Sequence, residues 1–256
     1  MNFKEEYLRI LRERLTNYSH SNYKYYTPIE PLEQTDKGII CEEKTYDSLE
    51  RFYGKDWPQH AVTMVGLVRL NILDELVEQI AKNNIAGDFF EAGVWRGGAS
   101  IYLQALNHVY LNGERNVWLA DSFEGLPPST HEKDLKYDFT QFDILAVSQE
   151  EVVQNFKNFN LLADNVKFVK GWFKDTLPHV KVGKISLLRL DGDLYESTMD
   201  ILNSLYHKVE PGGYIVVDDY CLDCCQEAIA DFRKQHNITS PIVEIDWTGV
   251  YWRKDS

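Results

Sequence analysis

The stretch Ile185-Ser-Leu-Leu-Arg-Leu-Asp-Gly-Asp193 is an apolar, strand-like run that ends in two carboxylates. A second run of the same kind, Tyr214-Ile-Val-Val-Asp-Asp219, also ends in two carboxylates. In an open parallel sheet, ligands bind in the crevice outside the carboxyl ends of the strands, and neighbouring strands lie about 5 Å apart. The two runs therefore predict an acidic site at the mouth of an α/β sheet.

The chain from Gly87 onward alternates apolar runs with amphipathic stretches, as βαβ units around a parallel sheet do. The turn signal Pro211-Gly-Gly213 stands immediately before its strand, and segments 242–245 and 249–252 predict a terminal hairpin. The predicted strands are 88–92, 116–120, 166–169, 185–190 and 213–217, and the predicted helices are 98–110, 148–162, 195–208 and 222–236.

Composition excludes several classes of protein. The 256 residues carry a net charge of -13, and no Lys/Arg-rich stripe offers a surface for nucleic acid. No apolar run approaches the roughly 20 residues that a membrane span needs. Only four cysteines occur, three of them clustered at Cys221, Cys224 and Cys225, which lack the spacing of a zinc site and instead predict packing where a helix starts. A reduced, cytoplasmic setting fits best.

The first 60 residues differ from the rest. Two helical patterns flank a Tyr-rich stretch from Tyr18 to Tyr26, followed by Pro28 and Pro31. A long connection of this kind is often a lid, a packing arm or a dimer contact, and the sequence leaves these alternatives open. We therefore expect an N-terminal helical or lid segment over 1–60 and a catalytic domain over 61–256. The polar stretch from Pro127 to Phe142 borders the expected crevice and is a second candidate for a mobile segment.

Three turns have the features of a cofactor site. The first turn, which joins a strand to a helix, is Glu91-Ala-Gly-Val-Trp-Arg-Gly-Gly98. The carboxylate of Glu91 would repel a pyrophosphate but suits the cationic S-adenosylmethionine (SAM). Asp121 ends the next strand, where an acid accepts hydrogen bonds from ribose hydroxyls. Trp172 and Phe173 follow the third strand, where aromatic rings either stack on an adenine or simply fill the core. The glycines of the first turn are explained equally well if they only permit a tight strand-to-helix connection.

The carboxylates suit a hard, oxygen-liganded ion such as Mg²⁺. We assign Asp191, Asp218 and Asp219 as its ligands and Asp193 as the general base that takes a proton from an alcohol. Asp193 has a nearly equal alternative role as the N-cap of the following helix. Asp219 has the alternative of pointing away from Asp218, because successive strand side chains alternate. The lone histidines His60, His131 and His179 are weaker candidates for the base.

At these residues the chain resembles the macrocin O-methyltransferase (TylF-like) family, which methylates sugar hydroxyls of natural products. The motifs that carry this resemblance run from Thr63 to Trp252: Thr63-Met-Val-Gly66 with Arg69-Leu70, the Glu91–Gly98 turn, Ala120-Asp-Ser-Phe-Glu-Gly125, Gly171-Trp-Phe-Lys-Asp-Thr176, Asp191-Gly-Asp193, Asp218-Asp-Tyr-Cys221 and Gly249-Val-Tyr-Trp252.

The resemblance implies a class I SAM-dependent methyltransferase: a Rossmann-like seven-stranded sheet with a terminal antiparallel hairpin and an N-terminal lid. It implies a homodimer or higher homo-oligomer, the same Mg²⁺ ligands, and Asp193 as base. The residues expected around SAM are Thr63, Met64, Glu91, Ala92, Gly93, Val94, Trp95, Asp121, Ser122, Phe123, Trp172 and Phe173.

The leading hypothesis is thus a Mg²⁺-dependent SAM O-methyltransferase acting on a sugar hydroxyl of a glycosylated small molecule. One alternative is a metal-dependent glycosyltransferase that uses Asp191-Gly-Asp193 as a D-x-D motif. The other is a non-catalytic SAM-binding protein, which the clustering of acids disfavours because a purely structural protein has no need of it.

Overall fold

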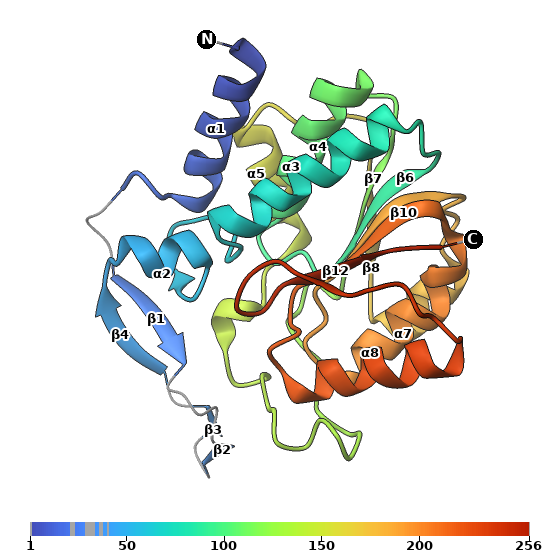
Figure 1. Cartoon of the computed structure of the whole chain (residues 1–256). Coiled ribbons are helices and arrows are strands. Elements are labelled where there is room, and N and C mark those ends of the chain that lie inside the picture. The colour runs from blue at the N-terminus through green and yellow to red at the C-terminus, as the bar shows by residue number, and fades with distance from the viewer. Residues whose placement is uncertain (1, 21–23, 29–33, 36–37, 40, 256) are drawn as a thin grey trace.

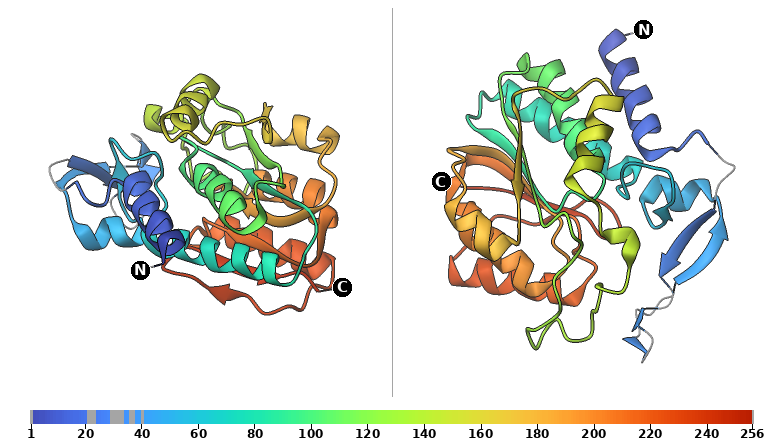
Figure 2. Two further views of the ribbon diagram at one scale, coloured as in Figure 1. Left: turned by 90° about the horizontal axis from the view of Figure 1, so that it is seen from above. Right: turned by 180° about the vertical axis from the view of Figure 1, so that it is seen from behind.

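The computed structural model describes residues 2–20, 24–28, 34–35, 38–39 and 41–255 (Figure 1). Its centre is a seven-stranded sheet with helices on both faces (Figures 1 and 2). The strand order is β11-β12-β10-β9-β6-β7-β8, in which the five strands from β10 to β8 are parallel and the pairs β10/β12 and β11/β12 are antiparallel. The predicted α/β fold and its terminal hairpin are confirmed.

The strands of the main sheet are β6 (Asp88–Ala92), β7 (Val117–Asp121), β8 (Val166–Lys170), β9 (Ile185–Leu190), β10 (Val209–Val217), β11 (Val243–Glu244) and β12 (Val250–Arg253). The helices around it are α3 (Leu67–Lys82), α4 (Gly98–Leu111), α5 (Gln149–Asn158), α6 (Phe173–Thr176), α7 (Tyr195–Leu205) and α8 (Asp223–Gln235). Short 3₁₀ turns lie at η1 (Asp143–Leu145), η2 (Leu177–His179) and η3 (Tyr206–Lys208).

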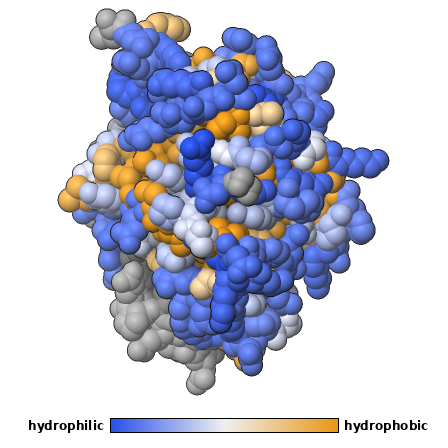
Figure 3. Space-filling view, turned by 45° about the vertical axis from the view of Figure 1, so that its right-hand side comes forward, coloured by the Kyte–Doolittle hydropathy of each residue, from blue (hydrophilic) through white to orange (hydrophobic). Residues whose placement is uncertain are grey.

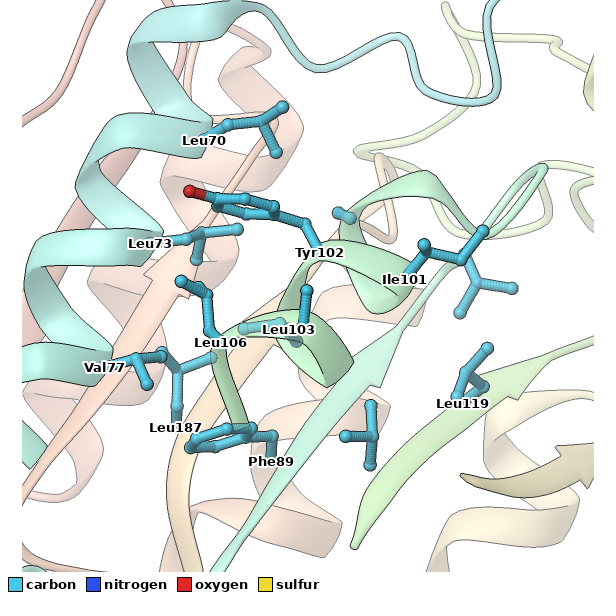
Figure 4. Packing of buried hydrophobic residues seen from close by; sticks show 14 of the residues in the cluster. Leu70, Leu73, Val77, Phe89, Ile101, Tyr102, Leu103, Leu106, Leu119 and Leu187 are labelled. Atoms are coloured by element: carbon cyan, nitrogen blue, oxygen red, sulfur yellow. The ribbon is translucent and has the colours of Figure 1, made fainter. Parts of the chain in front are cut away.

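Both faces of the sheet are buried because alternate strand residues point to opposite sides. Phe89 and Leu187 pack with α3 and α4 on one side (Figure 4), whereas Phe90 and Leu188 pack with α7 and α8 on the other. The result is two apolar layers that hold the strand ends in fixed register. This rigidity matters because the predicted site residues stand on those ends.

The chain reverses its direction of travel across the sheet at β6. It runs from β6 outward to β7 and β8, and then crosses back to β9 on the other side of β6. Such a switch point opens a crevice at the carboxyl ends of the strands. The crevice therefore lies between the turn after β6 and the Asp191-Gly-Asp193 turn after β9.

Three local predictions need correction. Pro211-Gly-Gly213 does not precede its strand but lies inside β10, where the register with β9 shifts between Val209 and Tyr214. Gly212 has φ +86°, so a bulge with a left-handed residue interrupts the ladder without ending the strand. The helix predicted over 148–162 ends at Asn158, and the one predicted over 195–208 ends at Leu205, where η3 begins.

The N-terminal segment consists of α1 (Phe3–Thr16), β1 (Lys24–Pro28), β2 (Gln34–Thr35), β3 (Gly38–Ile39), β4 (Cys41–Thr45), α2 (Ser48–Tyr53) and β5 (Trp57–Pro58). The apolar face of α1 joins the core beside α3 and α4. The buried pair Arg51–Asp56, 3.2 Å apart, joins α2 to the residue before β5, and β5 belongs to a small antiparallel sheet of order β4-β1-β5. Part of the Tyr-rich stretch (21–23) and Pro31 lie outside the described residues.

The stretch from Pro127 to Phe142 is fastened to the helices α7 and α8. The fully buried carboxylate of Asp134 accepts hydrogen bonds from the backbone N–H groups of Tyr195 (2.7 Å) and Glu196 (3.1 Å). Lys133 forms an ion pair of 2.7 Å with Asp231 of α8. Because Leu194, the N-cap of α7, supplies no side-chain hydrogen bond, Asp134 caps this helix from a distant part of the chain.

Within the described part of the chain, no helix combines the length and the apolar character that crossing a bilayer requires.

We expect Asp134→Ala to lower the free energy of unfolding by about 1–2 kcal/mol, because two backbone donors of α7 lose their acceptor. Urea denaturation measures the change. Asp164→Ala, at an exposed turn acid, is the control and should stay within about 0.5 kcal/mol of wild type. Equal stability of the Asp134 variant and wild type would contradict the capping role.

Candidate active site

A pocket of about 1290 Å³ occupies the crevice at the carboxyl ends of the strands. Its volume exceeds the roughly 300–1,000 Å³ of a typical site for one drug-sized ligand. The N-terminal segment contributes Trp57 to its wall, and the stretch after Pro127 contributes Tyr137 and Phe139. Figure 3 shows that hydrophobic side chains gather in a band between hydrophilic ones on one face of the molecule. The pocket is large enough for two molecules side by side.

The turn after β6 passes very close to the end of β9. Gly93 has φ +87°, and a Cβ atom there would lie 1.7 Å from the carbonyl oxygen of Asp191. Only glycine fits this backbone, and its absence of a side chain keeps the mouth of the turn open to the pocket. Trp95, also at positive φ, donates from Nε1 to the carbonyl oxygen of Ile144 (2.8 Å).

Asp121 at the end of β7 braces the same turn. One carboxylate oxygen accepts from the backbone N–H of Val94 (2.8 Å) and the other from that of Phe123 (2.7 Å). Burial raises the pKa of Asp121, while these backbone donors act in the opposite direction. Each carboxylate oxygen has a second lone pair, so the acid retains acceptor capacity toward the pocket for ribose hydroxyls.

Glu91 lies at the inner end of the pocket and is almost completely buried. It accepts a hydrogen bond from the Ser100 hydroxyl and another, of 2.5 Å, from Nη1 of Arg189. Burial raises the pKa of Glu91 to about 7, although Arg189 and Ser100 both lower it. The first turn of α4 and strand β9 thus fix this carboxylate from two sides.

Three carboxylates meet at the ends of β9 and β10. Asp191, Asp193 and Asp219 each offer an oxygen within 4.8 Å of the others. Asp193 has φ +55°, and its backbone N–H donates to Asp219 (3.0 Å). Burial and the charges of Asp191 and Asp218 raise the pKa of Asp193 to about 8. Burial and the charge of Asp193 likewise raise the pKa of Asp219 well above its usual range.

Asp218 stands beside this group, between two arginines. Nη1 of Arg69 lies 2.5 Å from one carboxylate oxygen, and Nη2 of Arg189 lies 2.7 Å from the other. Burial raises the pKa of Asp218, but the two guanidinium groups outweigh burial and hold it below the usual value. Of the predicted ligands, the structure therefore groups Asp191 and Asp219 with Asp193, and it places Asp218 in an ion-pair network at their side.

These donors fit a hard divalent cation. Oxygen ligands on neighbouring strand ends are the set that Mg²⁺ prefers, and the raised pKa values of Asp193 and Asp219 reflect crowding of like charge that a cation relieves. The oxygen Oδ1 of Asp218 is buried and takes no hydrogen bond from a described residue, so it also has lone pairs for an ion.

The structure places most of the predicted residues on the pocket. Ala92 and Phe123 are outside its lining, because Ala92 is covered in the core and the Phe123 ring packs 6.2 Å from that of Phe168. The predicted residues that line the pocket are Thr63, Met64, Glu91, Gly93, Val94, Trp95, Asp121, Ser122, Trp172, Phe173, Asp191, Asp193, Asp218 and Asp219.

Sequence reasoning missed two groups of residues. Arg189 contacts three of the acids, and its sequence signal was a charged residue inside an otherwise apolar strand. Trp57 lines the pocket from the N-terminal segment and Trp247 from the turn between β11 and β12, beside the end of β10, and neither shows a local pattern that marks it.

The family model described as Macrocin-O-methyltransferase (TylF) matches residues 4–254 of the chain. The mycinamicin III 3''-O-methyltransferase of Micromonospora griseorubida is 38% identical over 258 residues, covering 98% of this chain and 97% of that protein. A tetracenomycin rhamnosyl 4'-O-methyltransferase of Streptomyces olivaceus is 46% identical over 211 residues, 81% of each chain.

Among solved structures, the O-methyltransferase NovP superposes with a TM-score of 0.88 at 38% identity, covering 99% of this chain and all of that one. The calicheamicin methyltransferase CalS11, at 19% identity and a TM-score of 0.61, shares the fold. These matches favour methyl transfer over the glycosyltransferase and non-catalytic alternatives.

Gly93→Ala should abolish the affinity for S-adenosylhomocysteine and lower stability by about 2 kcal/mol or more, because the new methyl group meets the Asp191 backbone at a left-handed φ. Calorimetric titration and urea denaturation measure the two effects. Gly183→Ala is the matched control, since a Cβ there meets nothing within 4 Å. Normal binding by the Gly93 variant would exclude this turn as part of the donor site.

The pKa of about 8 for Asp193 predicts a pH dependence of stability in the absence of divalent ions. A carboxyl group that holds its proton more tightly when folded stabilises the protein below its unfolded pKa, near 4, and this contribution disappears as the pH rises through 8. We expect Tm in EDTA to fall as the pH rises from about 5 to 8.

Asp193→Asn should make that fall shallower, because the amide group does not ionise. Scanning calorimetry of both proteins at several pH values provides the measurement, with Asp164→Asn as the control. Parallel curves for wild type and Asp193→Asn would show that this carboxyl group does not carry the pH dependence.

Proposed function

The chain belongs to the macrocin O-methyltransferase (TylF) family and is a SAM-dependent O-methyltransferase, and on that premise we propose that it methylates a sugar hydroxyl of a glycosylated natural product with the help of Mg²⁺. The observation that carries the proposal is the grouping of Asp191, Asp193 and Asp219 beside the Glu91–Gly93 turn in one pocket. Donor and acceptor then share a single cavity at the switch point of the sheet.

The donor side of the proposal rests on the turn after β6. Gly93 has no side chain to cover the turn, Asp121 offers acceptors for ribose hydroxyls, and Glu91 offers negative charge for the ammonium group of SAM. Trp172 and Phe173 lie at the mouth of β8, where aromatic rings stack on an adenine.

For the metal, we propose Asp191, Asp218 and Asp219 as ligands. When bound, a Mg²⁺ ion lowers the pKa of a coordinated hydroxyl and fixes its direction of approach. Asp218 enters this set through Oδ1, the buried oxygen that accepts no hydrogen bond from a described residue. Arg69 keeps the other oxygen of Asp218 in place.

Asp193 is our candidate for the general base. Its backbone is held by Asp219, and its carboxyl group faces the pocket among like charges that raise its proton affinity. A base with a pKa near the working pH takes a proton most effectively. The alternative of an N-cap is less well supported, because Leu194 is the N-cap of α7 and Asp134 supplies the capping carboxylate.

The acceptor is a small glycoside, for which the pocket offers aromatic side chains from two separate segments of the chain. Tyr137 and Phe139 line the pocket from the stretch after Pro127, and Trp57 lines it from the N-terminal segment, where its ring lies 5.1 Å from that of Phe142 between centroids. The relatives named above act, as their names state, on mycinamicin III and on a rhamnosyl tetracenomycin. A sugar attached to a bulky aglycone therefore matches both the cavity volume and these names.

The test is incubation with SAM, Mg²⁺ and a panel of rhamnosides and other deoxysugar glycosides, followed by mass spectrometry for the gain of one methyl group. EDTA should abolish turnover and Mg²⁺ should restore it. Asp193→Asn should lower kcat by roughly 10²–10⁴-fold, the usual contribution of a general base. Asp191→Asn should lower turnover unless the Mg²⁺ concentration is raised.

Glu227→Gln, an exposed acid on α8, is the control and should retain wild-type turnover. Methylation that persists in EDTA and in Asp191→Asn would reject the metal role. A normal kcat for Asp193→Asn would instead reject only the assignment of Asp193 as the general base.

A further inference from the structure

Arg189 is a buried cation among the acids of the site, with its side chain only 2% exposed. Its Nη1 lies 2.5 Å from Glu91 Oε1 and 2.8 Å from Asp191 Oδ2, and its Nη2 lies 2.7 Å from Asp218 Oδ1. One guanidinium group thus joins the donor turn at the end of β6 to the acids that follow β9 and β10. A guanidinium group can make such a connection because its N–H donors point in several directions and contact several carboxylates at once.

Two of these three acids are ligands in the metal site proposed above. The contact between Nη2 and Asp218 Oδ1 has the length of an ion pair but lacks hydrogen-bond geometry, so both atoms stay without a hydrogen-bond partner among described residues. A contact of this kind is held by charge alone. A divalent ion bound to Asp191 and Asp218 would therefore be attracted by the same negative charges that Arg189 neutralises.

We infer that Arg189 is a positioning residue that takes the electrostatic place of the divalent ion: it neutralises Asp191 and Asp218 in the metal-free protein and competes with the ion for them. The inference rests on the metal dependence proposed above. Glu91, which is not among the proposed ligands, remains a partner for the guanidinium group. The acids can thus stay close together before an ion binds.

Arg69 does not have the same role. It reaches only the other oxygen of Asp218, and it is held by Asp246 at 3.0 Å and by the carbonyl oxygen of Gly54 at 3.1 Å. These contacts tie α3 to the end of α2 and to the segment before β12. Arg69 therefore anchors Asp218 to the scaffold, whereas Arg189 has three acids of the pocket as its ion-pair partners.

The test uses Mn²⁺ alone as the probe, with Arg189→Met and wild type compared by calorimetric titration and by thermal unfolding with and without Mn²⁺. Removing the competing charge should tighten Mn²⁺ binding by roughly ten-fold. The metal-free variant should be less stable than wild type, and Mn²⁺ should raise its Tm by more than it raises that of wild type.

Arg12→Met is the matched control, because it removes another partly buried Arg–Asp pair, to Asp74 at 2.7 Å, that lies away from the pocket. It should lose stability with an unchanged affinity for Mn²⁺. A purely structural role for Arg189 predicts that Arg189→Met behaves in the same way. Equal or weaker Mn²⁺ binding by Arg189→Met therefore overturns the inference while leaving the metal site standing.

If Arg189→Met does not fold, Arg189→Lys provides the same comparison. Its compact ammonium group reaches fewer of the three acids, so Mn²⁺ should bind more tightly than to wild type. Equal or weaker binding by that variant overturns the inference. Failure of wild type itself to bind Mn²⁺ is a different result, since it rejects the proposed metal dependence and the inference that rests on it.

Discussion

Crowding of negative charge at the carboxyl edge of the sheet is the constraint on which the rest of the site depends. Arg69 and Arg189 form ion pairs with four carboxylates, those of Glu91, Asp191, Asp218 and Asp246, and two more, those of Asp193 and Asp219, lie beside Asp191. Burial makes every unpaired charge costly, so the acids without an arginine partner hold their protons more tightly. Burial, together with the charges of the neighbouring aspartates, raises the pKa values of Asp193 and Asp219.

The fold makes such crowding possible because its strands end together. The switch at β6 brings the Gly93 turn against the backbone of Asp191, so the donor turn and the acids cannot move independently. Arg189 adds a second connection between the same two elements through Glu91 and Asp191. Backbone contact and ion pairing therefore fix the relative position of the donor turn and the acids, and methyl transfer needs that position to be fixed.

Periodicity was sufficient to predict the sheet, because strands buried on both faces read as apolar runs with sharp ends. The acids at those ends followed from the same pattern. Asp134 was not predictable, since its partner is a helix end distant in sequence and it has no local signal of capping. Pro211-Gly-Gly213 was misread because a bulge and a turn use the same residues, and only pairing with β9 distinguishes them. The ion-pair partners of Arg189 could not be predicted either, because they depend on which strands are neighbours in the sheet.

Two segments that line the pocket, the stretch after Pro127 and the N-terminal segment, are attached to the rest of the protein by different contacts. Asp134 and Lys133 bind the stretch after Pro127 to α7 and α8. In the N-terminal segment, Arg51 donates to the carbonyl oxygen of Met64 (2.5 Å) and so ties α2 to the segment before α3. Because both segments are attached to elements that carry pocket residues, the shape of the pocket and the positions of those residues depend on the same contacts.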